Sequence, residues 1–185
     1  MPSGQTHDRI TLWSLPIVTG LAGVITQSGN LTLMISGGFL FSGLMLSPDL
    51  DLQSRPYQRW GWLRWIWIPY QKVVRHRSIV SHGFVIGTTL RVLYLASWIV
   101  GLGVLSLAVI QFLRDEPSQS REMAQAVGRS LFEYRVEGIA LLVGLELGAI
   151  SHIVSDWVSS TYKRFKKKPK RKSSRRKPPA SKRNK

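Results

Sequence analysis

The feature that most constrains the fold of this chain is a stretch of 39 residues, 10–48, without a single charged side chain. A polar turn at residues 27–30 divides this stretch into two apolar arms, residues 10–26 and 31–46. Each arm is close to the minimum of about 17 residues that a helix needs to cross the hydrocarbon core of a bilayer. The pattern therefore predicts a helical hairpin within a membrane.

Two further segments are predicted to be membrane helices. Residues 92–113 are 22 uncharged and mostly apolar residues, which is long enough to span at about 1.5 Å per residue. Residues 138–160 are a less clear span because they contain Glu146. A charge at mid-membrane costs roughly 2.5–3.5 kcal/mol, so we expect Glu146 to pair with Arg91 at a similar depth. The sequence thus predicts an all-α integral membrane helical bundle of about four spans.

Two alternatives to this bundle are weaker. A secretory signal peptide would explain the first arm, but no small-residue cleavage site follows it and cleavage would discard His7. A soluble or peripheral helical protein would have to bury both long uncharged runs in a core. The 16 glycines and 7 tryptophans also suit a bilayer, where glycine permits close helix packing and tryptophan anchors at the interface.

The net charge of +16 comes almost entirely from the C-terminal end of the chain. Residues 161–185 contain 14 Lys and Arg and no acidic residue, whereas residues 1–160 contain 12 basic and 10 acidic residues. The tail has three prolines and no apolar periodicity, so we predict a helical membrane domain over residues 1–160 and a disordered tail over residues 161–185. Such a tail would bind anionic lipid headgroups, and nucleic acid is the alternative partner.

The distribution of charge also predicts an orientation. The loop at residues 48–81 has six basic residues against Asp49 and Asp51, whereas four arginines in residues 114–137 are matched by five acidic residues. Positively charged loops remain in the cytoplasm. We therefore expect a multi-pass protein of the cell (inner) membrane, in contact with its lipids and with both termini cytoplasmic.

With this orientation, seven potential metal ligands fall on the cytoplasmic side, near the ends of four apolar segments. They are His7, Asp49, Asp51, His76, His82, His152 and Asp156. Imidazole and carboxylate groups are ligands of borderline and hard divalent metals, and the absence of cysteine excludes a thiolate site. The sequence therefore predicts a metal site that is assembled from distant parts of the chain.

Two pairs within this set have a spacing that suits chelation. His152 and Asp156 are four residues apart, so on a helix they share one face, although a simple hydrogen bond at a helix end would use the same spacing. Asp49 and Asp51 would point the same way in an extended segment, although a turn or a helix cap would also account for them.

The other ligands carry less information when taken singly. His76 and His82 are six residues apart, which is no regular same-face interval, and a disordered terminus is the alternative for His7. Arg75 or Arg77 could bind a phosphate oxygen through its guanidinium group, or could serve only to set the membrane orientation. The prediction of a metal site therefore depends on the whole set.

The motifs resemble those of two families of membrane proteins. The sequence contains His7, Pro48-Asp-Leu-Asp51, His76-Arg-Ser-x-x-Ser-His82 and Gly148-x-x-Ser-His152-x-x-x-Asp156. It resembles small uncharacterised membrane proteins described as metal-binding, and it is similar to inner-membrane metal-dependent hydrolases with His-Arg-x-x-x-His-Ser and Pro-Asp-x-Asp motifs. The ligand layout of these hydrolases is similar to that of zinc-dependent phospholipase C and nucleases. The resemblance covers about residues 5–160, with Gly83 where the hydrolases have serine.

The resemblance implies a metal-dependent hydrolase that acts on a phosphoester or a lipid-linked substrate at the cytoplasmic face. Zinc is the expected metal, with manganese, iron and magnesium as alternatives, and seven N and O ligands suit either one six-coordinate ion or two ions. The competing interpretation is a non-catalytic membrane module with a structural metal site, whose tail recruits anionic lipid, nucleic acid or a partner.

Two further patterns give structural expectations. Six aromatic residues in the segment 57–70 are predicted to form an interfacial anchor that lies flat below the bilayer, with a lid over the metal site as the alternative. Gly144 and Gly148 are spaced to allow the close approach of another helix, from the same chain or from a second copy.

Overall fold

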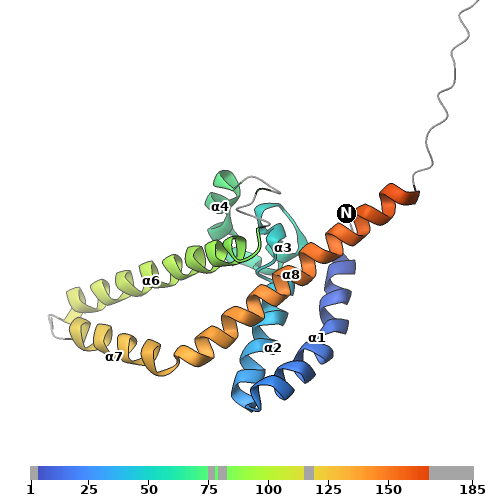
Figure 1. Ribbon diagram of the computed structural model, residues 1–185. Coiled ribbons are helices and arrows are strands. Elements are labelled where there is room, and N and C mark those ends of the chain that lie inside the picture. Colours follow the sequence, from blue (N-terminus) through green and yellow to red (C-terminus); the bar gives the residue numbers. More distant parts are fainter. Residues whose placement is uncertain (1–3, 75–77, 79–82, 115–118, 167–185) are drawn as a thin grey trace, which may run out of the picture.

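In the computed structural model, the described residues are 4–74, 78, 83–114 and 119–166, and they contain helices but no strand. This confirms the predicted all-α class. Four of the helical segments are long and apolar enough to cross a membrane. In chain order (Figure 1), the elements are α1 (Gly4–Thr26), α2 (Gly29–Leu44), η1 (Pro48–Asp51), α3 (Arg55–Arg59), η2 (Gly61–Trp67), α4 (Ile68–Val73), α6 (Ile86–Arg114), α7 (Gln119–Glu133) and α8 (Arg135–Lys166).

The predicted hairpin is present as α1 and α2, with its turn where the polar residues lie. Gln27 adopts a φ of 49°, which reverses the chain direction between the two helices. Ser28 then starts α2, because its side chain accepts a hydrogen bond from the Leu31 amide. Local sequence thus sets this turn without help from the rest of the chain.

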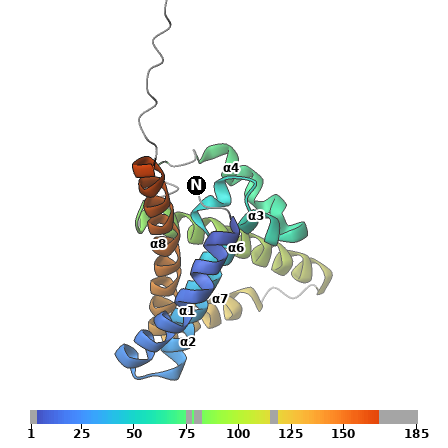
Figure 2. The same cartoon turned by 90° about the vertical axis from the view of Figure 1, so that its right-hand side faces the viewer.

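Helices α1, α2 and α8 pack side by side (Figure 2), and α2 and α8 touch through their backbones. A Cβ atom placed on Gly148 would lie 2.6 Å from the Phe39 carbonyl oxygen, and one on Gly38 would lie 2.6 Å from that of Leu141. Only glycine, which has no side chain, allows two helix backbones to approach this closely. The Gly144 and Gly148 spacing therefore serves packing within one chain.

The aromatic segment forms a core rather than a flat anchor. Trp67 and Tyr70 are almost fully buried, and both pack against Tyr94 of α6. Trp62 and Trp65 are exposed, by 81% and 45%, as an interfacial position requires. The interfacial prediction is wrong for Tyr57, Trp67 and Tyr70, because α3, η2 and α4 pack on one another and on η1 and bury these three rings. The buried cluster comprises Leu46, Leu50, Tyr57, Ile66, Trp67, Tyr70, Val74 and Leu145.

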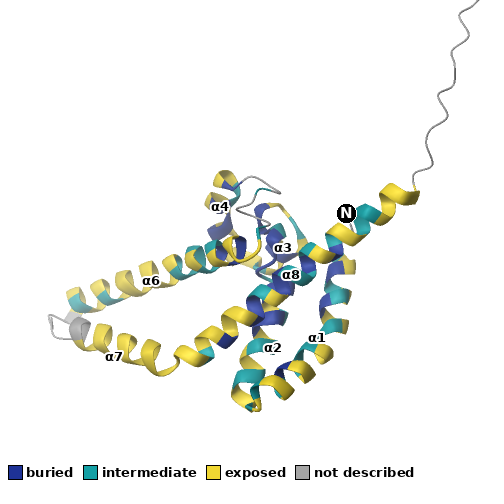
Figure 3. Ribbon diagram, in the orientation of Figure 1, coloured by how far each residue is buried: buried dark blue, intermediate teal, exposed yellow. Residues whose placement is uncertain are grey.

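Helices α6 and α7 extend away from the α1–α2–α8 unit as a second hairpin, and they are exposed along most of their length (Figure 3). The apolar side chains of α6 include Ile99, Leu102 and Leu105, each more than half exposed. Helix α7 was not predicted, since its residues were assigned to a loop. Its apolar residues recur at Met123, Val127 and Leu131, the four-residue interval of an amphipathic helix.

Helix α8 ends at Lys166, six residues beyond the predicted end of the membrane domain, so residues 161–166 are helical rather than disordered. Basic side chains in the last turn, among them Lys163 and Arg164, are favourable at the negative end of the helix dipole. Lys166 also lies over the ring of Tyr162, 4.8 Å from its centre. The rest of the predicted tail, residues 167–185, lies outside the described residues.

A buried arginine links α6 to the other elements. Arg91 is 1% exposed and interacts electrostatically with Tyr70, Glu146 and Asp51. Glu146 accepts a hydrogen bond from the Val85 amide at 2.8 Å, and its pairing with Arg91 stays a prediction. Burial raises the pKa of Tyr70, so its phenol remains protonated beside Arg91 at neutral pH.

Candidate metal centre

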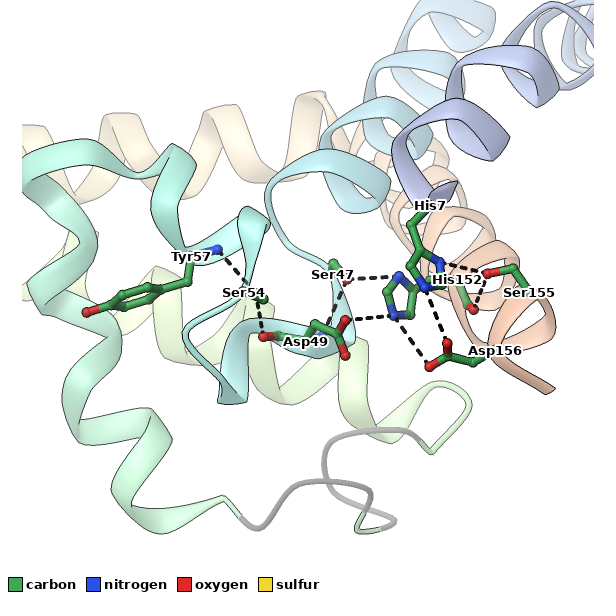
Figure 4. A network of polar contacts seen from close by, with 8 residues as sticks. All are labelled: His7, Ser47, Asp49, Ser54, Tyr57, His152, Ser155 and Asp156. Carbon is green, nitrogen blue, oxygen red and sulfur yellow. Dashed lines mark hydrogen bonds and ion pairs between the residues drawn. The ribbon is translucent and has the colours of Figure 1, made fainter. Parts of the chain in front are cut away.

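Three segments that are distant in sequence bring imidazole and carboxylate groups together at one end of the α1–α2 hairpin (Figure 4). Helix α1 contributes His7, η1 contributes Asp49, and α8 contributes His152 and Asp156. One possible ligand atom from each of His7, His152 and Asp156 lies within 4.8 Å of the others. These three residues form the core of a candidate metal centre, and Asp49 adjoins it through His152.

The position of His7 is fixed by the residue that follows it. Asp8 accepts hydrogen bonds from Arg55 at 3.0 Å and from Arg59 at 2.6 and 2.9 Å, which ties the first turn of α1 to α3. Arg59 also donates to the Leu44 carbonyl at the end of α2. The alternative of a disordered terminus is therefore wrong for His7, which is only 6% exposed.

The position of Asp49 is fixed by the short helix η1. Ser47 caps this helix by accepting a hydrogen bond from the Asp49 amide at 3.4 Å, and Pro48 begins its first turn with a preset φ. Ser54 then donates to the Asp49 carbonyl at 2.7 Å. The Asp49 side chain consequently points toward His152 of α8, with Oδ2 3.4 Å from Nε2.

The geometry around His7 determines which of its ring nitrogens carries a proton. Ser155 Oγ lies 2.8 Å from His7 Nδ1 and 2.8 Å from the His152 carbonyl oxygen. A hydroxyl has one hydrogen, and a carbonyl can only accept, so Ser155 donates to His152 and accepts from His7 Nδ1–H. The neutral His7 ring then has its lone pair on Nε2, which faces Asp156 Oδ1 at 3.2 Å.

A lone pair and a carboxylate oxygen at this distance repel each other unless a cation lies between them. The cation could be a second proton on His7 or a metal ion. His7 and His152 stack with ring centres 3.9 Å apart, so a charge on His7 would be placed against a second imidazole in a desolvated site. A metal ion satisfies the same atoms while both imidazoles remain neutral.

His152 fits the role of a metal ligand in the same way. Its Nδ1 lies 3.2 Å from the hydroxyl of Ser47, while its buried Nε2 makes no hydrogen bond with the described residues. That Nε2 instead faces two carboxylates, 3.4 Å from Asp49 and 3.9 Å from Asp156. Histidines that bind metals hold their other ring nitrogen in a hydrogen bond of this kind.

The spacing of the atoms also suits an ion. Ligands about 2.0–2.2 Å from a tetrahedral zinc ion stand roughly 3.3–3.6 Å apart. The separations here are 3.2 Å for His7 and Asp156, 3.4 Å for His152 and Asp49, and 3.9 Å for His152 and Asp156. The two stacked rings direct their Nε2 atoms side by side, and Asp156 is the residue that both rings reach. The residues present therefore fit a divalent metal.

Of the other predicted ligands, Asp51 is the one that the structure describes, and it is not part of this group. It is buried and interacts electrostatically with Tyr70 and Arg91. His76 and His82 lie outside the described residues, so their participation stays a prediction. The structure thus brings together four of the five predicted ligands that it describes.

Sequence reasoning missed the residues that hold the ligands in place. Ser47 and Ser155, which contact the two histidines, are 0% and 8% exposed. Ser155 stands within a quoted motif, directly before Asp156, and Ser47 directly precedes the motif that begins at Pro48. A serine at the edge of a ligand motif is a usable signal, since such ligands need a second hydrogen-bonding partner.

The substitution Ser155→Ala should weaken metal binding by about 10–100-fold, because His7 loses the acceptor that fixes its tautomer and ring orientation. The measurement is a competition titration of the purified protein against a chromophoric chelator. Ser160→Ala is the matched control, since the Ser160 hydroxyl makes the same type of bond to a carbonyl three residues earlier, on an exposed face. Equal affinities in the two variants would contradict the role of Ser155.

Comparison with known proteins agrees with the binding of a metal. A protein of Aquifex aeolicus (strain VF5), described as an uncharacterized protein, is 35% identical over 129 residues, which cover 69% of this chain and 91% of that protein. No solved structure matches the chain. Residues 2–166 match the model of a family described as "Uncharacterized metal-binding protein (DUF2227)", a range that includes all four of the clustered ligands. The chain belongs to this metal-binding family.

Proposed function

We propose that this protein is a metal-dependent hydrolase of the cell membrane that acts on a phosphoester at the cytoplasmic face. The observation that carries the proposal is the access to the candidate metal centre. His7, Asp49 and His152 line a pocket of about 450 Å³ that is partly open to the outside. A purely structural metal site is closed by its protein ligands, whereas a catalytic site keeps room for water and substrate.

Different residues would have different roles in such a site. His7, His152 and Asp156 would hold the ion, and zinc is the first choice because two imidazoles and a carboxylate are a common catalytic zinc set. When bound, a divalent ion supplies Lewis-acid polarisation and lowers the pKa of water that it coordinates. Asp49 also lines the pocket, where it can accept a proton from water as a general base.

The apolar surface of the helices supports a membrane location. The clearest case is α6, because none of the residues in the most apolar 18-residue window of its candidate span Ile86–Leu113 is buried within the protein. Exposed apolar surface on this scale is unfavourable in water by about 25 cal/mol per Å² and is favourable in lipid. With the charge bias of the loops, this supports four spans with cytoplasmic termini and a basic tail that binds anionic lipid, with nucleic acid as the alternative partner of the tail.

A structural metal site is the second candidate, and one observation favours it. The clustered ligands come from α1, η1 and α8, so an ion bound by all four would cross-link three segments that are distant in sequence. Both functions need His7, His152 and Asp156. The catalytic and the structural functions differ in whether the pocket binds a substrate that is then hydrolysed.

Metal-dependent turnover tests the proposal. Protein purified from carbonate-washed membranes, where four spans should retain it, is stripped with a chelator and reloaded with zinc, manganese or magnesium. We expect hydrolysis of p-nitrophenyl phosphate esters or phospholipid only in a reloaded form. Asp49→Asn should lower this rate by about 10²–10⁴-fold without loss of metal, since it removes a general base.

Glu133→Gln is the control for this experiment, because it neutralises an exposed carboxylate on α7. Rates that Asp49→Asn leaves unchanged would indicate a contaminating enzyme. A reloaded protein that hydrolyses none of these esters would exclude the hydrolase and leave the structural site.

A further inference from the structure

The pocket beside the candidate metal centre contains a guanidinium group in addition to the metal ligands. Arg55 and Asp8 line the pocket together with His7, Asp49 and His152. We infer that Arg55 binds a phosphoryl oxygen of the substrate, and that the pocket selects a singly charged phosphate group. The identity of the substrate rests on the proposed function, whereas the anion site follows from the geometry of the pocket.

Of the two arginines near Asp8, Arg55 has the larger number of donors to spare and is the one that lines the pocket. Arg59 directs its guanidinium at both carboxylate oxygens of Asp8 and at the Leu44 carbonyl. Arg55 makes one hydrogen bond to the described residues, through Nη1 to Asp8, and its side chain is 45% exposed. A guanidinium has five N–H donors, so most of those on Arg55 remain available to an oxyanion.

Arg55 is also held in place before any ligand binds. Its aliphatic stem lies against Gly4 in the first turn of α1, where an added Cβ would be 2.8 Å from Arg55 Cδ. Asp8 holds the other end of the side chain at 3.0 Å. A charged group that is already oriented loses less conformational freedom on binding, which favours affinity.

The charges of the described residues favour an anion with a single negative charge. Asp49 and Asp156 together offset the charge of a divalent ion at the centre. Asp8 offsets one of the two positive charges on Arg55 and Arg59. One positive charge remains beside the pocket, which matches a phosphodiester or a singly protonated phosphate monoester rather than a neutral carboxylic ester.

Phosphate binding to the zinc-loaded protein tests the inference without any need for turnover. We expect inorganic phosphate to bind wild type, measured by calorimetry, with an affinity that Arg55→Gln lowers by about ten- to a hundredfold. Arg55→Lys should recover only part of this loss, because an ammonium group cannot form the bidentate contact. Zinc content should be equal in all variants, since Asp8 keeps Arg59 as its anchor.

Arg64→Gln is the charge-matched control, because Arg64 is an exposed arginine of η2 that does not line the pocket. A second arm adds phosphatidylcholine vesicles with or without phosphatidylglycerol. Arg55-dependent binding to the anionic vesicles alone assigns the phosphate to a lipid headgroup, and binding of free phosphate alone assigns it to a soluble substrate. Either result supports the anion site.

Two results would overturn the inference. One is the absence of phosphate and anionic-vesicle binding by zinc-loaded wild type at millimolar concentration. The other is binding that Arg55→Gln and Arg64→Gln affect equally. Arg55-dependent phosphate binding without hydrolysis would support the anion site and exclude the proposed reaction. Hydrolysis that does not depend on Arg55 would support the reaction and exclude the anion site.

Discussion

Replacing His152 by alanine is expected to reduce the affinity for metal by more than about 100-fold. Loss of a residue that only hydrogen-bonds to a metal ligand already lowers this affinity by about 10–100-fold. His152 Nε2 faces both Asp49 and Asp156, so its removal leaves two carboxylates close together with no base between them. Elemental analysis of detergent-purified protein should then show metal in wild type and only a trace in the variant.

Val154→Ala is the matched control for this experiment. Val154 lies on the same helix but is 46% exposed, so its truncation should leave the metal content unchanged. Circular dichroism should show the same helix content in both variants, which separates a lost ligand from a lost fold. A His152→Ala protein with wild-type metal stoichiometry would refute the assignment of the metal centre.

The substitution Gly148→Leu is expected to destabilise the protein by about 3 kcal/mol or more, at the upper end of the usual effect of overpacking. The new side chain would meet backbone atoms of Phe39 and Gly43, which cannot turn aside as a side chain can. The melting temperature should fall by about 6–12 °C if each kcal/mol shifts it by roughly 2–4 °C. Metal should be lost as well, since His152 is one turn along α8 from this contact.

Gly103→Leu provides the control, because no heavy atom lies within 4 Å of the Cβ position at Gly103 on α6. Replacing a glycine within a helix removes a penalty of about 0.8–1.0 kcal/mol, so this variant should be as stable as wild type or slightly more so. Thermal unfolding of both variants, followed by circular dichroism, gives the comparison. A Gly148→Leu protein with the melting temperature of wild type would show that α2 and α8 do not pack as described.

The main helices could be predicted because their sequence signal is long and simple. Charge-free runs located α1, α2 and α6, and only the ends differed by a few residues. Helix α7 could not be found in this way, because it is short and rich in polar residues. Its signal is a four-residue apolar period within a polar segment, which indicates a helix only when that period is sought.

The metal ligands could be predicted in part for a different reason. The spacing of His152 and Asp156 is local, so a helix alone places them on one face. The approach of His7 and Asp49 depends on tertiary structure, and the sequence indicated only that they lie on the same side of a membrane. The tautomer of His7, which depends on Ser155, is visible only once the distances are known.

Composition was misleading where the chain folds back on itself. The aromatic segment was assigned to the lipid interface because tryptophan and tyrosine prefer that layer. Burial of Trp67 and Tyr70 depends on contacts with Tyr94, which is on a different helix. Arg55 was counted only among the six basic residues of the loop at 48–81 that set the membrane orientation. No sequence pattern reveals its pairing with Asp8.

The metal ligands come from the first helix and the last, with Ser155 and His7 separated by 148 residues. During synthesis, the ribosome must therefore complete nearly the whole helical domain before the centre exists. A nascent chain that has formed only α1, α2 and η1 offers one histidine and Asp49, too few groups to retain an ion. Acquisition of metal would then be a late event in biogenesis, and the presence of the ion would mark molecules in which α8 has joined the earlier helices.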